Sequence, residues 1–257
     1  MNNRILYKAT GASGCDFSIE TAIGCKFNCT YCSSKLIAKR NGWINNWRKP
    51  IYKDISELEK KLSELSKHKN CLVFVSPTTD PFMDKITSDK SIKIIKEINN
   101  LGHRCRILTK GILPLELVNL SNKNEVGATV TKLKNSKKLE PFSPSSEKRL
   151  LQLEKIANKG IYTFISMQPV LDNNFDEVLQ IAKRAVFVSE IFFGGLGYFG
   201  IPQKDKIKKR LEVSDFLFEF CGNNDIVLFN DIYVRKEINL RDENWIIPIK
   251  KLKVKKT

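Results

Sequence analysis

Residues 25–32 read CKFNCTYC and place three cysteines within eight positions, at Cys25, Cys29 and Cys32. Two closely spaced cysteines are typical of a redox pair, and four are typical of a closed zinc site. Three thiolates can hold three irons of a cubane cluster, which leaves the fourth iron open to another ligand. Cys15 is the only further cysteine close by in the sequence. The stretch therefore predicts an iron–sulfur site, and a zinc ion held by three cysteines and a water stays open as the alternative.

The rest of the chain alternates apolar runs with amphipathic stretches, in pairs of about 30 residues that are typical of βα units. The apolar runs predict strands at 17–23, 71–75, 104–109, 125–131, 161–170, 190–197 and 225–230. The amphipathic stretches predict helices at 54–68, 88–102, 114–120, 145–160, 175–185 and 213–222. The first of these helices is expected to begin with a capping box of Ser56 and Glu59.

These units predict an α/β fold, because continuous apolar strands are typical of a parallel sheet covered on both faces. A closed eight-unit barrel needs about 250 residues, more than the predicted units occupy. We therefore predict a partial (β/α)6 TIM-like barrel over residues 15–230, with a doubly wound sheet as the alternative. Residues 1–14 are expected to form an N-terminal extension, and residues 231–257 a basic tail that packs on the barrel or extends from it. In both folds the site lies at the carboxyl ends of the strands, where the cysteine stretch is expected.

Composition and charge narrow the classes of partner. The chain has 257 residues and a formal net charge of +16, which favours an anionic partner such as a nucleic acid. Only ten of its 44 basic residues are arginines, so a general bias toward lysine explains the charge equally well. No apolar run approaches the ~18 residues of a membrane span, and the first residues lack the apolar centre of a signal peptide. We predict a cytoplasmic protein without a membrane partner, whose cysteines stay reduced.

The pattern of Cys25, Cys29, Tyr31 and Cys32 matches the C-x3-C-x-aromatic-C motif of the radical S-adenosylmethionine (SAM) superfamily, which the chain resembles. The resemblance implies a [4Fe–4S] cluster on the three cysteines, with SAM chelated to the open iron. It implies reductive cleavage of SAM to methionine and a 5′-deoxyadenosyl radical, which abstracts a hydrogen atom from substrate. An electron donor such as a flavodoxin or ferredoxin is then required. Tyr31 is expected to pack near the adenine.

Four later stretches resemble the spore photoproduct lyase-like branch of this superfamily. They are VSPTTDPF at 75–82, ILTKG at 107–111, ATVT at 128–131, and LEPFSPSSEKRLLQLEKIANKGI at 139–161. The branch carries a Thr-Ser/Thr-Asp-Pro stretch, a Thr-Lys pair, a strand rich in serine and threonine, and a Glu-Pro…Arg-Leu helix entry in this order.

The resemblance gives four further residues a predicted role. Thr79 would contact the amino or carboxylate group of SAM, and Asp80 would shape the turn that holds Thr79. Lys110 would reach the SAM carboxylate or ribose. Thr129 would form a hydrogen bond to SAM from its strand. Each residue also has an ordinary structural explanation, since a TTDP stretch forms turns and a threonine suits a strand.

Two departures from the branch bear on the reaction. Spore photoproduct lyase has a hydrogen-donating cysteine where this chain has Pro77, and a tyrosine where this chain has Ser33. Thymine-dimer repair is therefore not expected. We predict a radical SAM enzyme acting on an unidentified substrate, with a nucleic acid or nucleotide left open. The alternative is a metal-stabilised nucleic-acid-binding module without catalysis. The stretches NGWINNWRKP at 41–50 and GGLGYFG at 194–200 are candidates for shaping the substrate pocket.

Overall fold

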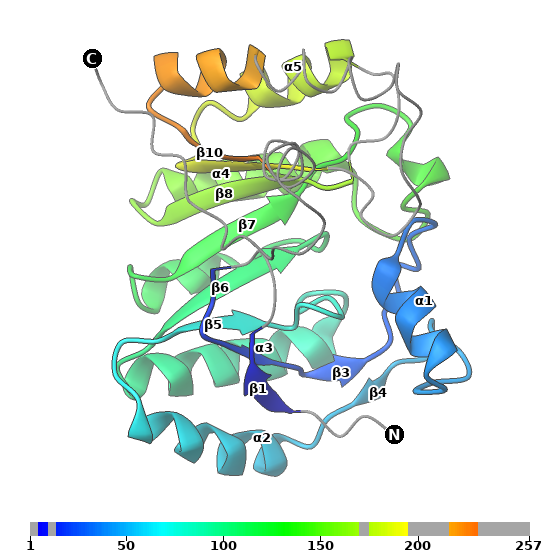
Figure 1. Ribbon diagram of the computed structural model, residues 1–257, viewed down its shortest axis with the longest axis vertical. Helices are drawn as coiled ribbons and strands as arrows, with labels where there is room; N and C mark the ends of the chain where they lie inside the picture. The colour runs from blue at the N-terminus through cyan, green and yellow to red at the C-terminus, as the bar shows by residue number, and fades with distance from the viewer. Residues whose placement is uncertain (1–4, 10–13, 170–174, 195–215, 231–257) are drawn as a thin grey trace, which may run out of the picture.

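The computed structural model describes residues 5–9, 14–169, 175–194 and 216–230 (Figure 1). The predicted basic tail at 231–257 and all but the first residue of the stretch at 194–200 lie outside this part of the chain. Within it, no helix combines the length and the apolar character that crossing a membrane requires.

The main sheet has eight described strands, which lie side by side in the order β1-β2-β5-β6-β7-β8-β9-β10. All neighbours are parallel except β1 and β2, which pair antiparallel with Leu6 opposite Ile19. A doubly wound sheet would reverse its strand order at a switch point. The described strands show no such reversal, so the partial-barrel prediction is confirmed. The bounds are β1 Leu6–Lys8, β2 Phe17–Ile19, β5 Leu72–Val75, β6 Arg104–Thr109, β7 Glu125–Thr129, β8 Tyr162–Met167, β9 Glu190–Phe193 and β10 Val227–Asn230.

Helices cover the outer face of this sheet (Figure 1). They are α2 Ile55–Leu62, α3 Lys85–Asn100, α4 Ser146–Ala157 and α5 Phe175–Arg184, with residues 216–223 also helical. Short 3-10 turns form η1 Ser63–Lys67, η2 Leu115–Asn119 and η3 Ser136–Lys138. The apolar stripe of each long helix packs on the strands, each large aliphatic side chain contributing about 1.5–3 kcal/mol. The helices α3 and α4 bury Ile94, Ile95, Ile98, Leu150, Leu153 and Ile156 in this way.

The predicted strand at 17–23 is interrupted. After β2 the chain leaves the main sheet, and β3 (Ala22–Ile23) pairs antiparallel with β4 (Ile51–Tyr52) in a separate two-stranded sheet. The break follows from a contact that the sequence pattern does not contain: the hydroxyls of Thr21 and Ser76 lie 2.7 Å apart, and Thr21 N donates to Ser76 Oγ at 3.3 Å. This turn carries the cysteine stretch away from the barrel wall.

The predicted capping box of Ser56 and Glu59 was wrong. Asp54 is the N-cap of α2, and its carboxylate accepts from Ser56 N at 2.7 Å. Ser56 already lies in the first turn, so its hydroxyl cannot cap the helix. A capping box does form at α3, where Asp84 and Thr87 bond each other's backbone N–H. The helix predicted at 88–102 accordingly begins at Lys85.

Candidate active site

The three cysteines lie in the loop between β3 and α1 (Ser33–Arg40), and all three are free thiols. Neighbouring segments hold the loop by its backbone: Cys25 N donates to the carbonyl of Trp47 and Thr30 N to that of Leu139, both at 2.9 Å. Cys32 is the N-cap of α1, and its sulfur accepts from Lys35 N at 3.4 Å. The cysteine loop is therefore fastened to two other parts of the chain, at Trp47 and at Leu139.

Gly24 lets the chain enter this loop. Its φ is +96°, and a Cβ atom there would lie 2.8 Å from the carbonyl oxygen of Trp47, so a larger residue would have to displace backbone. The Gly24 carbonyl accepts a hydrogen bond from the hydroxyl of Thr79, which lies in the loop after β5. Thr79 thus joins the carboxyl end of β5 to the cysteine loop.

The chemistry of this donor set fits a cluster. Cys25 is 9% exposed and Cys29 is 7% exposed. Burial, reinforced by the charge of Asp80, raises the pKa of Cys25 well above its usual range. Burial raises the pKa of Cys29 to about 11, against the opposing charge of Lys110. Without a cation the two thiols stay protonated at neutral pH, so binding of a metal centre releases their protons.

A cubane cluster does not require the three sulfurs to meet at one point, because each thiolate binds a different iron. Among the residues that the structure describes, no three cysteine, histidine or acidic side chains converge as the ligands of one common metal ion would. Cys25, Cys29 and Cys32 would hold three irons, which leaves the fourth iron open to another ligand.

Asp80 connects two strand ends beside the loop. It is buried, and its Oδ1 accepts from the hydroxyl of Thr109 at 2.6 Å and from Phe82 N at 2.9 Å. Its Oδ2 accepts from Lys110 N at 2.7 Å. Burial raises the pKa of Asp80 above its ordinary value, although these hydrogen bonds and the charge of Lys110 oppose the rise. The carboxylate therefore ties the loop after β5 to the end of β6 and sets where the Lys110 side chain begins.

Tyr31 of the cysteine motif is held by Glu140, from the segment after β7. The Tyr31 hydroxyl donates to Glu140 Oε1, which also accepts from Thr131 Oγ1 at 2.9 Å. The ammonium group of Lys110 lies 5.3 Å from the centre of the Tyr31 ring, in cation–π contact. Burial and the charge of Glu140 raise the pKa of Tyr31 well above its usual range. Glu140 therefore holds the Tyr31 hydroxyl while the Tyr31 ring contacts Lys110 directly.

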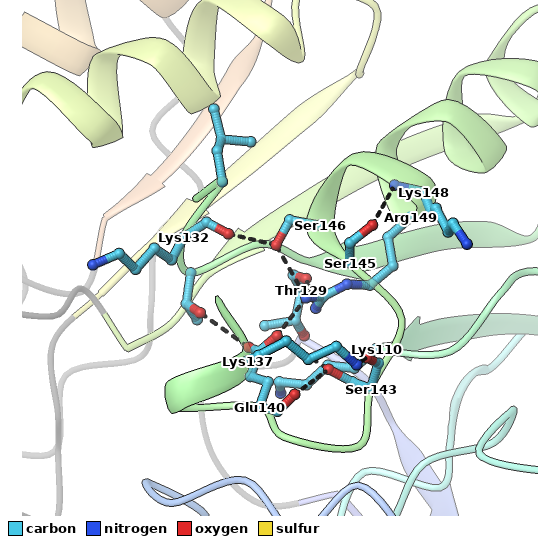
Figure 2. A network of polar contacts seen from close by, with 12 residues as sticks. Lys110, Thr129, Lys132, Lys137, Glu140, Ser143, Ser145, Ser146, Lys148 and Arg149 are labelled. Atoms are coloured by element: carbon cyan, nitrogen blue, oxygen red, sulfur yellow. Dashed lines mark hydrogen bonds and ion pairs between the residues drawn. The ribbon is translucent and has the colours of Figure 1, made fainter. Parts of the chain in front are cut away.

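The Glu140 carboxylate is in turn fixed by Arg149 of α4 (Figure 2). Glu140 is 0% exposed and Arg149 is 1% exposed, and their side chains form an ion pair. The guanidinium also donates to the backbone carbonyl of Thr129 and, at 3.0 Å, to Ser146 Oγ. Although burial raises the pKa of Glu140, the charges of Arg149 and Lys110 bring it below its ordinary value. The network thus links the cysteine loop, β7 and α4.

The structure brings the predicted residues to one region, the carboxyl ends of β5, β6 and β7 beside the cysteine loop. Glu140 and Arg149 were not singled out as site residues from the sequence. The available signal was the Glu-Pro…Arg stretch at 140–149, since buried charges are found paired.

Glu20 was also missed. It follows β2, and its buried carboxylate accepts from the Tyr7 hydroxyl at 2.8 Å and from Thr78 N at 3.2 Å. Burial raises the pKa of Glu20 to about 7. The signal for it was a single acid within the otherwise uncharged stretch FSIETAI.

A charged and aromatic layer closes the inner side of the sheet below the site. Arg106 of β6 forms ion pairs with Glu125 at 3.0 Å and Glu190 at 2.6 Å, at the amino ends of β7 and β9. Its guanidinium lies over the rings of Phe164 and Phe192, 4.5 Å and 4.6 Å from their centres. This layer lies toward the amino ends of the strands, whereas Thr79, Lys110 and Thr129 lie at or just beyond the carboxyl ends of β5, β6 and β7.

Comparisons with known proteins identify the family of this chain. A family model described as the radical SAM superfamily matches residues 19–185. An uncharacterized protein of Methanocaldococcus jannaschii is 28% identical over 194 residues, which cover 72% of this chain and 71% of that protein.

The similar solved structures share the fold at low sequence identity. Spore photoproduct lyase complexed with dinucleoside spore photoproduct gives a TM-score of 0.67 at 15% identity, covering 88% of this chain and 79% of that chain. A mutant of the same enzyme with bound AdoMet and dinucleoside spore photoproduct gives 0.66 at 13% identity, covering 86% and 78%. SuiB of Streptococcus suis bound to S-adenosylmethionine gives 0.59 at 11% identity, covering 83% and 46%. Because the family model covers the cysteine motif and well over half of the chain, this protein belongs to the radical SAM superfamily, whose enzymes use a [4Fe–4S] cluster and SAM.

Proposed function

We propose that this protein abstracts a hydrogen atom from a nucleic acid or nucleotide by radical SAM chemistry. One observation carries the radical SAM chemistry of this proposal: three free cysteines, two of them buried, share a loop that bonds to Thr79 through Gly24 and contacts Lys110 through the Tyr31 ring. Cys25, Cys29 and Cys32 would hold the cluster. When bound, the cluster supplies one electron to SAM, which then yields methionine and the 5′-deoxyadenosyl radical.

The chain's own residues would bind and orient SAM. The amine of Lys110 has no carboxylate within ion-pair distance among the described residues, and it lies against the Tyr31 ring near the strand ends. A cation in this position suits the SAM carboxylate or ribose. Tyr31 would present its ring beside the adenine while Glu140 holds its hydroxyl.

The Thr79 hydroxyl has a more restricted role than the sequence indicates. Its hydrogen is already donated to the Gly24 carbonyl, so toward a ligand the oxygen can only accept a hydrogen bond. We therefore assign Thr79 to the amino group of SAM, which donates, and not to the carboxylate. Thr129 is the last residue of β7, and Arg149 holds its backbone carbonyl, so that its side chain would bond SAM from the strand end. Asp80 would set the turn without touching SAM, because its oxygens are used by Thr109, Phe82 and Lys110.

The substrate class rests on charge and on likeness. The net charge of +16 favours a polyanion, and the similar spore photoproduct lyase structures hold a dinucleoside. The reaction would nevertheless differ from thymine-dimer repair. Pro77 has no thiol from which a hydrogen atom could be donated, and Ser33 stands where that enzyme has a tyrosine.

An anaerobic assay tests the proposal. The cluster is reconstituted and reduced with dithionite, SAM is added, and 5′-deoxyadenosine is measured. We expect product from the parent protein and none from Cys25→Ala, Cys29→Ala or Cys32→Ala. Cys15→Ala is the matched control, since Cys15 is the nearest other cysteine in sequence and would be the fourth ligand of a zinc site. Loss of metal binding in Cys15→Ala, with zinc and no 5′-deoxyadenosine in the parent, would establish the metal-stabilised binding module instead.

A further inference from the structure

The cysteine loop has a side that faces away from the barrel. A small core, separate from the main one, buries Ala22, Cys25, Phe27, Cys29, Ala38, Trp47 and Met83. Its outer wall is α1 with the chain that follows, which turns back as Trp43 N donates to the Ala38 carbonyl at 3.0 Å. Figure 1 shows α1 standing beside the strand ends, outside the main sheet. SAM would bind on the barrel side, where Lys110 and Thr129 lie, and the wall separates the loop from solvent on the other side.

This wall carries charge of one sign. Residues 21–53 contain seven lysines and arginines and no aspartate or glutamate. Lys26 is neutralised by Asp84 at 2.7 Å, Lys53 is buried, and Lys35 is partly buried and donates to Asn28 Oδ1 at 2.8 Å. The remaining exposed cations have no carboxylate partner in the part of the chain that the structure describes; they are Lys39, Arg40, Arg48 and Lys49.

Apolar side chains are exposed among these cations. Leu36 of α1 is 46% exposed, and Phe142 is 47% exposed with the Arg48 guanidinium 3.7 Å from its ring centre. The hydrogen bond from Thr30 N to the Leu139 carbonyl brings the segment of Phe142 against the cysteine loop. Exposed apolar groups surrounded by like charges are typical of surfaces that bind a charged protein partner. We call Leu36, Lys39, Arg40, Arg48, Lys49 and Phe142 the basic wall.

We propose that the basic wall is the docking surface of an acidic one-electron carrier protein. The inference rests on the proposed function, since only a cluster in the loop needs the electron. Electron tunnelling falls steeply with distance, and Cys32, an expected ligand, is itself the N-cap of α1. A carrier on the wall is therefore close to the cluster without obstructing the barrel side. The step moves one electron from the reduced carrier to the oxidised cluster, and no bond forms or breaks.

Charge reversal on the wall tests the proposal. We compare Lys39→Glu/Arg40→Glu with Lys155→Glu/Lys159→Glu as the matched control. Both pairs are exposed and change the charge equally, and Lys155 lies in the last turn of α4 as Lys39 and Arg40 lie in that of α1. Both pairs therefore remove positive charge from the last turn of a helix, at Lys39 and Arg40 in one and at Lys155 in the other. Reduction of the reconstituted protein by acidic flavodoxin or ferredoxin is followed by the loss of visible cluster absorbance.

At low salt, the wall variant should be reduced by the carrier at least about tenfold more slowly than the parent, because electrostatic steering raises association rates by about 10 to 1,000-fold. The difference should disappear at high salt, and the control should match the parent. The extent of reduction by dithionite should be equal in all three proteins. A second pair, Arg48→Glu/Lys49→Glu, should behave like the first and guards against a folding defect in α1.

Three results would overturn the proposal. The wall variants could be reduced by the carrier as fast as the parent; neither carrier could reduce a parent that dithionite reduces; or the variants could lose binding of a single-stranded oligonucleotide while carrier reduction is unchanged. The last would assign the wall to nucleic acid. Failure of the proposed function is a separate outcome, since it would appear as absent 5′-deoxyadenosine with dithionite, before any carrier is added.

Discussion

The buried ion pair of Glu140 and Arg149 gives a sharp test of how the site is held together. In Glu140→Gln the side chain keeps its shape and loses its charge, which leaves the guanidinium of Arg149 buried and uncompensated. Breaking one partner of a buried pair costs about 3–5 kcal/mol. For a chain of this size each 1 kcal/mol lowers the melting temperature by about 2–4 °C, so we expect a decrease of roughly 6–20 °C.

The matched control is Glu147→Gln, the same substitution in an exposed pair. Glu147 is 52% exposed and pairs with Arg184 at 3.1 Å. An exposed pair contributes about 0–1 kcal/mol, so this variant should melt within about 4 °C of the parent. Both variants are compared in the cluster-free protein by thermal and urea unfolding. The chemical change is identical in both variants, whereas Arg184 is partly exposed and keeps its ion pair with Glu154 at 3.1 Å.

A double variant separates the ion pair from the rest of the network. Adding Arg149→Met to Glu140→Gln removes the unpaired charge, so the double variant should be more stable than Glu140→Gln alone. Equal stability of Glu140→Gln and Glu147→Gln would refute the reasoning, since burial would then have no effect. The double variant could instead lose more stability than Glu140→Gln and Arg149→Met lose together as single variants. This result would show that Arg149 acts through Thr129 and Ser146.

Three further outcomes are expected. Gly127→Ala should lower the free energy of unfolding, measured in urea, by about 1–3 kcal/mol, because its Cβ would lie 2.4 Å from the Phe164 ring. Phe164→Leu in the same chain should recover part of the loss. An unchanged free energy of unfolding in Gly127→Ala would contradict the packing. The pKa of Glu20 is raised from 4.5 to about 7 in the folded protein, so the folded form holds the proton more tightly than the unfolded chain. The free energy of unfolding should therefore fall as the pH rises between these values, by about 3 kcal/mol in total. Glu20→Gln should remove this slope in pH-dependent unfolding, and a slope that persists would exclude Glu20 as its source. Lys110→Met should weaken SAM binding about tenfold or more in equilibrium dialysis, because a charge-assisted hydrogen bond is lost. The cluster content should stay unchanged. Unaltered affinity for SAM would show that Lys110 does not belong to the SAM site.

The sequence alone predicted the features that depend on short-range patterns. The spacing of Cys25, Cys29 and Cys32 indicated the cofactor, because ligand spacing within one loop is a local property. The alternation of apolar runs and amphipathic stretches predicted the α/β partial barrel. The predicted helix ranges 88–102 and 145–160 end on Gly102 and Gly160, which follow α3 and α4 closely and adopt positive φ.

The tertiary structure decided what depends on residues far apart in the chain. The first predicted strand is broken at Thr21 because Ser76, which follows β5, competes for its backbone. The order of the strands, which separates the partial barrel from a doubly wound sheet, is a property of pairing and not of any one strand. Tyr31, Glu140 and Arg149 become one network only when the segment after β7 folds onto the cysteine loop. A periodic pattern reports which face of an element is buried, whereas the partner of a buried charge is chosen by packing, and that choice is made only in three dimensions.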